Sequence, residues 1–391
     1  MVLRTNAVKW AALASVWLIG CAGSAGDPVG GAEMNVPERD SGPAGAEFLG
    51  KVDTLGKLPP DRLVAIMNDG TAYLLPTSAV DYSKAVGSPR GLPPGEEEIP
   101  DAEPPARTPR LPALEQSAGE VGKVSQALLP SSYAIGGIIG DDNRFPVYST
   151  TVGGISTNQR RVVDLKTDPV CTGSFIGPRQ VLTDAHCVYI RSIGWGQPSY
   201  VVPAQQGICL SSNWVCNSGL VTEPFGRLDR YTTIVPSNWI NTGGDQYDQA
   251  VVIIQDYASW GYWFSSSFGV APYPPAAPTH QGYPSRSLPC VNSPDTTNSS
   301  GYSAPWNKLC LGLQYKDYGG YVASHDSNFV WGVYDSQSGE SGSPLVYSTT
   351  VYGTLLGRQS DYAAFKRVMS SLVCDALARF PSTVMGNPGC Y

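Results

Sequence analysis

One serine and the order of its possible partners limit the folds open to this chain. Ser341 stands in the run Gly-Glu-Ser-Gly-Ser-Pro at 339–344, and all three histidines precede it. A serine hydroxyl is a poor nucleophile until a base removes its proton, and an imidazole that titrates near neutral pH is a suitable base. In α/β-hydrolases the histidine follows the serine and a glycine stands at the position that Ser343 occupies, so that class is excluded.

The residues around His186 point to a known family. Thr-Asp-Ala-His-Cys at 183–187 is similar to the Thr-Ala-Ala-His-Cys box of the chymotrypsin-like serine peptidases, and the run at 339–344 resembles their nucleophile loop. The carboxylate that orients the histidine would be Asp248, since Asp-Gln-Ala before an apolar strand matches their Asp-x-Ala. Asp245 and Asp256 fit less well, because neither directly precedes Ala-Val-Val-Ile.

The resemblance implies a catalytic triad of His186, Asp248 and Ser341. It also implies an oxyanion hole formed by the backbone N–H groups of Gly339 and Ser341, because a glycine at 339 lets the backbone turn both groups toward one oxygen. Two further runs are similar to the V8-type (glutamyl-endopeptidase-like) enzymes of this superfamily. They are Ile-Ile-Gly-Asp-Asp-Asn-Arg at 138–144 and Gly-Tyr-Pro at 282–284.

The expected fold is all-β, a chymotrypsin-like double β-barrel with a C-terminal helix, preceded by a largely unstructured prosegment. The serine protease domain is placed at 131–391, with barrel 1 at about 135–245 and barrel 2 at about 246–391. Residues 172–176 and 180–183 are predicted strands around a turn, which puts His186 on a loop at a strand end. Apolar residues spaced along 361–380 fall roughly on one face and predict the helix.

Residues 1–21 form a predicted targeting segment. Arg4 and Lys9 precede an apolar core at 10–19, which is too short to span a bilayer. Leu-Ile-Gly-Cys at 18–21 resembles a bacterial lipobox, which implies acylation of Cys21. The expected location is the bacterial cell envelope, at the outer membrane or cell surface, or the extracellular medium after release. Ordinary signal cleavage near residues 22–25 is the alternative.

Residues 22–130 are rich in proline, glycine and acids and are predicted to be a prosegment or tether. Within this range, 63–66 and 71–75 have the composition of a small helix or a hairpin. The segment either folds against the protease and inhibits it, or holds the catalytic domain away from the membrane. In trypsin-like zymogens a freed N-terminal amine pairs with the acid before the nucleophile, here Glu340. Activation by cleavage at Ile138 or Ile139 is therefore a hypothesis, with a solvated Glu340 as the alternative.

Eight cysteines remain without Cys21, an even number that predicts disulfides in an exported protein. Pairing of neighbours gives Cys171–Cys187, Cys209–Cys216, Cys290–Cys310 and Cys374–Cys390, of which the first is implied by the resemblance. A zinc site is disfavoured because the chain has three histidines and no Cys-x-x-Cys. We expect no metal and no cofactor.

Substrate specificity receives conflicting signals. Asp335 lies six residues before Ser341, where trypsin-like enzymes keep the acid of the S1 pocket, which implies cleavage after Arg or Lys. In V8-type enzymes a Tyr-Asp pair stands two residues further from the nucleophile. Leu355 occupies the position of a histidine in glutamyl enzymes, and Arg358 near the pocket mouth would favour acidic substrates. The residue preferred at P1 is therefore left open.

The sequence predicts a secreted or surface-anchored serine endopeptidase that acts on protein or peptide substrates as a monomer. The alternative is a weak or inactive protease-fold lipoprotein that serves as a binding scaffold, since Asp184 and Glu340 depart from the usual motifs. An esterase is a weaker possibility. A net charge of −7 without a visible basic patch argues against nucleic acid as a partner.

Overall fold

The computed structural model describes residues 42–78, 136–137, 144–147, 155–167, 170–189, 198–210, 215–256, 267–275, 277–284, 291–292, 308–309, 314–317, 320–337, 339–359, 362–383 and 390. All of them belong to one compact unit, Gly42–Tyr391. Within these ranges, no helix combines the length and the apolar character that crossing a bilayer requires.

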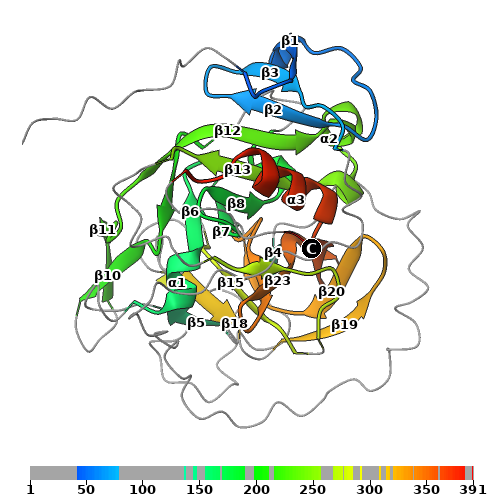
Figure 1. Ribbon diagram of the computed structural model, residues 1–391. Helices are drawn as coiled ribbons and strands as arrows, with labels where there is room; N and C mark the ends of the chain where they lie inside the picture. The colour runs from blue at the N-terminus through cyan, green and yellow to red at the C-terminus, as the bar shows by residue number, and fades with distance from the viewer. Residues whose placement is uncertain are drawn as a thin grey trace, which may run out of the picture. The chain divides into compact units, whose positions relative to one another are not determined.

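The first large sheet contains a closed barrel (Figure 1). Its strand order is β1-β3-β2-β12-β13-β8-β7-β6-β9, and a second pairing of β9 with β12 closes six of these strands into a ring. The strands are β1 (Glu47–Lys51), β2 (Leu63–Met67), β3 (Thr71–Leu74), β6 (Val162–Leu165), β7 (Cys171–Phe175), β8 (Gln180–Thr183), β9 (Tyr200–Pro203), β12 (Leu228–Pro236) and β13 (Ala250–Ile254).

The second large sheet is an open half-barrel. Its order is β19-β20-β24-β23-β22-β15-β18-β5, and β14 pairs with β23. The strands are β5 (Arg144–Val147), β14 (Gly269–Val270), β15 (Thr279–Gly282), β18 (Gln314–Asp317), β19 (Tyr321–His325), β20 (Phe329–Val333), β22 (Pro344–Tyr347), β23 (Thr350–Gln359) and β24 (Tyr362–Arg367).

Short elements complete the unit. Three two-stranded ribbons pair β10 (Gln206–Leu210) with β11 (Val215–Thr222), β16 (Val291–Asn292) with β17 (Lys308–Leu309), and β21 (Ser336–Gln337) with β4 (Gly136–Gly137). The helices are α1 (Thr157–Arg161), α2 (Ser237–Thr242) and α3 (Ser370–Arg379), and the 3₁₀ turns are η1 (Val52–Thr54), η5 (Ala185–Cys187) and η6 (Asp245–Tyr247).

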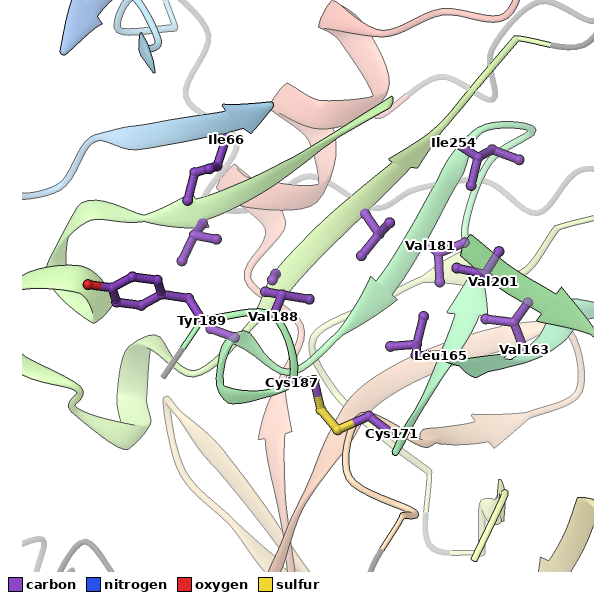
Figure 2. Packing of buried hydrophobic residues seen from close by; sticks show 14 of the residues in the cluster. Ile66, Val163, Leu165, Cys171, Val181, Cys187, Val188, Tyr189, Val201 and Ile254 are labelled. Atoms are coloured by element: carbon purple, nitrogen blue, oxygen red, sulfur yellow. A yellow bond between two sulfur atoms is a disulfide. The ribbon is translucent and has the colours of Figure 1, made fainter. Parts of the chain in front are cut away.

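Alternation along the barrel strands builds two apolar cores. Ile254 of β13 points into the barrel, together with Val163 and Val181 from other strands (Figure 2), and Val252 of β13 belongs to the same core. Val251 and Ile253 point to the opposite side, where α3 and the second sheet contribute Leu372, Leu377, Val346 and Val351. Because successive side chains of a strand face opposite sides, one strand serves both cores. The all-β fold with a C-terminal helix is confirmed.

The predicted helix over 361–380 is wrong in its first half. Residues Tyr362–Arg367 form β24, which pairs with β20 on one side and β23 on the other, and the helix begins only at Ser370. Phe365 is buried between these neighbours in an apolar cluster with Tyr334 and Leu355. A strand buried on both faces has no polar side, so its apolar spacing also matches a helical face.

Residues 42–78, expected to belong to the prosegment, extend the first sheet. The hairpin β2–β3 forms, and β2 pairs along its whole length with β12, from Thr232↔Met67 to Pro236↔Leu63. Val64, Ala65 and Ile66 are completely buried. The barrel boundaries also differ from those expected. Strand β13 belongs to the first barrel, so that barrel extends to residue 254, whereas β5 pairs with β18 in the second sheet.

Candidate active site

His186 and Asp248 are brought together by two neighbouring strands. His186 lies in η5 directly after β8, Asp248 lies just before β13, and the strands pair with Thr183 opposite Ala250. Nδ1 of His186 lies 2.8 Å from Oδ2 of Asp248, and the backbone N–H of His186 donates to Oδ1 at 2.8 Å. The two carboxylate oxygens therefore fix the position of His186 and the orientation of its ring. The other ring nitrogen, Nε2, does not bond to Asp248 and is the atom that could accept a proton from a hydroxyl group.

The other two acids considered have different surroundings. Asp256 accepts hydrogen bonds from the hydroxyl groups of Ser382 and Thr383 and from the backbone N–H of Thr383. These bonds fix the segment that follows α3. Asp245 is half-buried in η6. Asp248 is 4% exposed and is the carboxylate that contacts His186.

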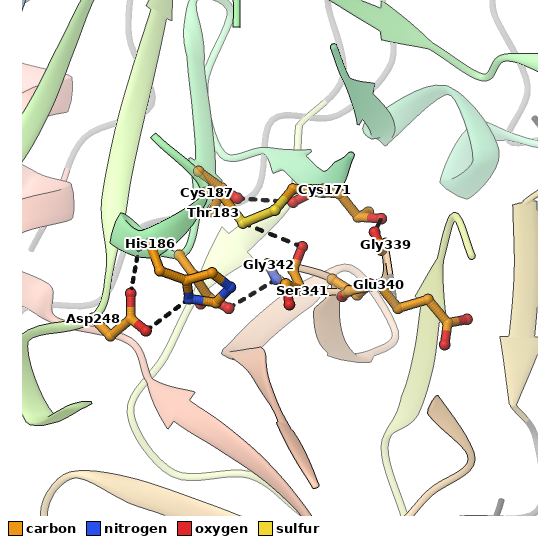
Figure 3. The surroundings of a disulfide bond; sticks show 12 residues. Cys171, Thr183, His186, Cys187, Asp248, Gly339, Glu340, Ser341 and Gly342 are labelled. Atoms are coloured by element: carbon orange, nitrogen blue, oxygen red, sulfur yellow. Dashed lines mark hydrogen bonds and ion pairs between the residues drawn. A yellow bond between two sulfur atoms is a disulfide. The ribbon is translucent and has the colours of Figure 1, made fainter. Parts of the chain in front are cut away.

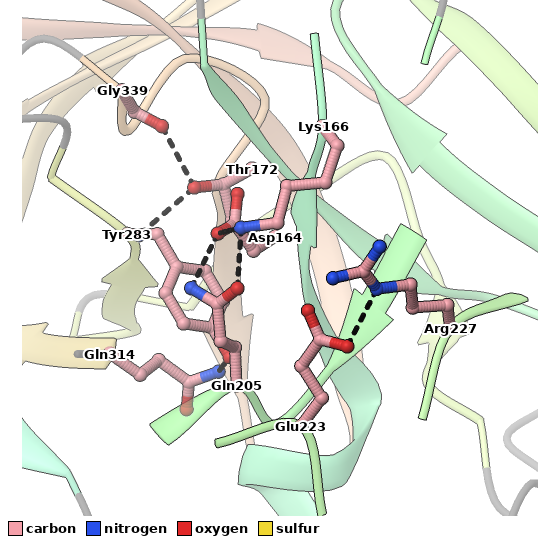
Figure 4. Close-up of polar contacts among 9 residues, drawn as sticks. All are labelled: Asp164, Lys166, Thr172, Gln205, Glu223, Arg227, Tyr283, Gln314 and Gly339. Atoms are coloured by element: carbon pink, nitrogen blue, oxygen red, sulfur yellow. Dashed lines mark hydrogen bonds and ion pairs between the residues drawn. The ribbon is translucent and has the colours of Figure 1, made fainter. Parts of the chain in front are cut away.

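Ser341 lies in a tight loop that is seated on the first barrel. The backbone N–H of Thr172 in β7 donates to the carbonyl oxygen of Ser341 at 2.8 Å. The Thr172 hydroxyl donates to the carbonyl oxygen of Gly339 at 2.9 Å and accepts from the backbone N–H of Tyr283 at 2.9 Å (Figure 4). Gly339 and Gly342 have φ values of +93° and +81°, a region that favours glycine. The glycines thus shape the loop and Thr172 holds it.

A second contact joins the serine loop to the histidine loop. The backbone N–H of Gly342 donates to Oδ2 of Asp184 at 2.8 Å, and Asp184 lies two residues before His186. The disulfide between Cys171 and Cys187 joins β7 to η5 beside this contact (Figure 3). Sequence reasoning treated Asp184 only as a departure from the usual box, and that departure was the available signal.

Electrostatics around His186 favour its protonated form. Burial by itself would lower the pKa of the imidazole, but the charge and hydrogen bond of Asp248, with Asp184 and Asp245, outweigh it and raise the pKa to about 9. Burial, and then the charge of Asp248, raise the pKa of Asp184 well above the ordinary aspartate value. The protonation of Asp184 and that of His186 are therefore linked.

Glu340 and the remaining histidines have clear positions. Glu340 is completely buried, which excludes the solvated loop acid, and Figure 3 shows its side chain directed away from His186. His280 is buried against the ring of Phe365 at a centroid distance of 5.5 Å. His325 is exposed and contacts Tyr273.

The residues expected at the specificity pocket differ in burial. Asp335 is 1% exposed, and its backbone N–H donates to Oδ2 of Asp317 at 2.9 Å. Leu355 is buried with Phe365, and its backbone is paired with the serine loop through Gly342 and Ser343. Arg358 is half-buried on β23. The strand that carries Leu355 and Arg358 is therefore hydrogen-bonded to the serine loop at Leu355.

The described residues contain two disulfides and one cluster of cysteine and histidine side chains. Cys374 of α3 is bonded to Cys390, and Cys209 and Cys216 face each other in the β10–β11 register. The side chains of that pair, and Cys21, Cys290, Cys310 and residues 138–143, lie outside the described residues. The side chains of Cys171, His186 and Cys187 offer ligand atoms within 4.8 Å of one another, but both sulfurs are in the disulfide and provide no thiolate.

Comparison with known proteins gives one curated relative. No protein-family model matches the chain. Glutamyl endopeptidase of Bacillus licheniformis is 26% identical over 232 residues, which is 57% of this chain. The chain spans 58% of the length of that relative.

Two solved protease structures are similar to this chain. A Glu endopeptidase in complex with MPD is 24% identical, with a TM-score of 0.44, covering 60% of this chain and 95% of that chain. A thermostable serine protease, AL20, from an extremophilic microorganism is 16% identical, with a TM-score of 0.37, covering 57% of this chain and 95% of that chain. The closed six-stranded barrel, the half-barrel and the terminal helix give this chain the chymotrypsin-like serine protease fold, with glutamyl endopeptidase as a distant relative.

Proposed function

We propose that this chain is a serine endopeptidase of the glutamyl-endopeptidase-like kind. The observation that carries the proposal is the pair of 2.8 Å hydrogen bonds between His186 and Asp248, formed beside a serine loop that is anchored to the same barrel. An imidazole that is oriented by a carboxylate and lies beside a glycine-flanked serine is the arrangement that activates a hydroxyl group for attack on an acyl carbon. The distant similarity to glutamyl endopeptidase supports the same chemistry.

The proposed reaction proceeds through an acyl-enzyme. Oγ of Ser341 attacks the carbonyl carbon of a peptide bond while Nε2 of His186 takes the hydroxyl proton, and Asp248 stabilises the imidazolium. The N–H groups of Gly339 and Ser341 bind the oxyanion. His186 then gives its proton to the leaving amine, and the C–N bond breaks. A water molecule, deprotonated by His186, hydrolyses the ester and restores Ser341.

The proposal is tested by intact-mass analysis with a fluorophosphonate probe, which forms a covalent bond with an activated serine. We expect one adduct on the wild-type protein and none on Ser341→Ala. Ser371→Ala, which removes an exposed serine of α3, is the control and should label as the wild type does. Absence of an adduct on the full-length form and on proteolytically trimmed forms would instead favour a binding scaffold.

Location and activation belong to the same proposal. We propose that Cys21 is acylated, that the protein is held at the cell envelope as a monomer, and that cleavage near Ile138 frees an amine for Glu340. The place of Glu340 supports this last step, because it is completely buried and stands directly before Ser341, where the acid that pairs with the freed amine stands in trypsin-like zymogens. Metabolic labelling with palmitate, compared with Cys21→Ser, tests the anchor. N-terminal sequencing of active enzyme tests the cleavage, and an active form that begins at Cys21 would refute it.

A further inference from the structure

Asp184 is a buried acid without a local structural role. It lies between β8 and η5 with no exposed surface. An aspartate before a helical turn commonly caps the first N–H groups, but the side chain of Asp184 makes no capping bond to η5. Burial of an acidic group without compensation is costly, so a contact elsewhere must favour its position.

That contact is the amide that follows Ser341. Oδ2 of Asp184 accepts the N–H of Gly342 at 2.8 Å, although the residues are 158 positions apart in the chain. The same N–H lies 2.9 Å from the carbonyl oxygen of Leu355 in β23. One amide is therefore shared between the first barrel, through Asp184, and the second sheet, through Leu355. The Ser341 loop lies at the junction of the two sheets.

The backbone of the Ser341 loop approaches the barrel closely at Gly342. A Cβ atom at Gly342 would collide with the carbonyl oxygen of Thr172 and the hydroxyl group of Thr183. Thr183 is the last residue of β8, next to Asp184 in the chain. The close approach to the barrel and the hydrogen bond to Asp184 thus both involve Gly342, the residue that follows Ser341.

The surroundings of Asp184 determine which form of the acid makes this contact. Asp184 interacts with the charged groups of Asp248, His186 and Lys366, and it accepts hydrogen bonds from the Thr354 hydroxyl and the Gly342 amide. Burial, and then the charge of Asp248, raise the pKa of Asp184 well above the ordinary aspartate value, which favours the protonated form of this carboxyl group. A neutral carboxyl group accepts the amide without placing a second full negative charge beside His186.

We propose that Asp184 is a positioning residue for acylation, whose buried carboxyl group holds Gly342, and with it Ser341, against the loop that carries His186. The inference rests on the proposed endopeptidase function, because it concerns the same serine and histidine. It assigns to Asp184 a task that is absent when alanine occupies this position.

Two substitutions separate the hydrogen bond from the charge. Asp184→Ala removes the acceptor, whereas Asp184→Asn keeps an oxygen of the same geometry without any charge. We expect the rate of fluorophosphonate labelling to fall roughly 5- to 30-fold in the alanine variant, the range for loss of one buried hydrogen bond. The asparagine variant should label within about threefold of the wild type.

The pH dependence of labelling distinguishes positioning from an effect of charge. Because Asp184 is neutral in the proposal, Asp184→Asn should leave the midpoint of the rise with pH unchanged. A midpoint that falls by about one pH unit would show that Asp184 acts through its charge on His186 and would overturn the positioning role. Equal losses of rate in the Asn and Ala variants, with the wild-type thermal midpoint retained, would overturn it as well.

Amide hydrogen exchange gives a readout that does not depend on activity. In the full-length protein, exchange across 339–343 should be faster in Asp184→Ala and close to the wild type in Asp184→Asn. Asp245→Ala is the control, because it removes another carboxyl group near His186, whereas the carboxyl group bonded to the Gly342 amide belongs to Asp184. Unchanged exchange in Asp184→Ala would refute the inference. A wild-type protein that does not label, but shows the expected exchange, would refute the proposed function and leave the positioning contact established.

Discussion

Ile66, in the middle of β2, tests whether residues 42–78 stabilise the first barrel or only lie against it. Its side chain is completely buried and belongs to the core inside the first barrel. Its backbone pairs with Thr233 of β12 and Ala72 of β3, and its carbonyl oxygen accepts the Thr232 hydroxyl at 2.9 Å. A segment that only tethers the domain would not need such contacts.

The expected cost of Ile66→Ala follows from this burial. Truncating a buried isoleucine to alanine removes favourable transfer from water and leaves a cavity, which together cost about 2–5 kcal/mol of unfolding free energy. For a domain of this size, that loss lowers the thermal midpoint by roughly 4–20 °C. Phe48→Ala is the control in the same segment. Phe48 is 66% exposed and contacts Tyr73 at its edge, so its removal should cost about 1 kcal/mol or less.

The assay is thermal and urea unfolding of full-length protein that also carries Ser341→Ala, so that self-digestion cannot contribute. We expect a clear separation between Ile66→Ala and Phe48→Ala in both experiments. Equal midpoints for the two variants would mean that β2 unfolds independently of the barrel. In that case the reasoning from burial would be wrong, and the segment would be a detachable prosegment.

Three further predictions follow from the site. Because the base must be neutral and the pKa of His186 is raised to about 9, the rate of fluorophosphonate labelling should rise from pH 7 to 9. Proton binding by His186 also stabilises the folded state; this stabilisation is complete below about pH 6.5 and is lost as the pH rises through 9. Gly342→Ala should abolish labelling, since its φ is +81° and a Cβ would collide with Thr172 and Thr183. Replacing Cys374 and Cys390 by serine opens a 16-residue loop and should cost about 3 kcal/mol in denaturant unfolding without changing the labelling rate.

Some parts of this structure could be predicted from the sequence because the residues that determine them are adjacent in the chain. The strands on either side of the turn at 177–179 were expected at 172–176 and 180–183, and the structure has them at Cys171–Phe175 and Gln180–Thr183. His186 follows them at the strand end, as the local pattern indicated. Such features depend on short-range alternation and turn residues, which a sequence displays directly.

Other parts depend on contacts between distant segments. Strand β24 has the apolar spacing of a helix and is a strand only because β20 and β23 enclose it. Residues 63–66 and 71–75 were expected to form a small helix or a hairpin, and the hairpin forms; its pairing with β12, more than 160 residues later, was not expected. The contact of Asp184 with Gly342 spans 158 positions. In each case the deciding contact joins segments that are far apart in the chain, and the local sequence pattern does not reveal such a contact.

Residues 42–78 contact the elements that precede Asp248 in the chain and position it. Strand β12 pairs with β2 on one side and β13 on the other, and α2 and η6 lead from β12 to Asp248. The side chain of Asn241 in α2 binds Leu58 twice, donating to its carbonyl oxygen at 3.0 Å and accepting its N–H at 2.9 Å. Ser237, at the start of α2, donates to the carbonyl oxygen of Pro59 at 2.7 Å and accepts the N–H of Arg62 at 3.1 Å. Since both ends of α2 are held by this segment, its packing supports the position of the carboxylate that orients His186.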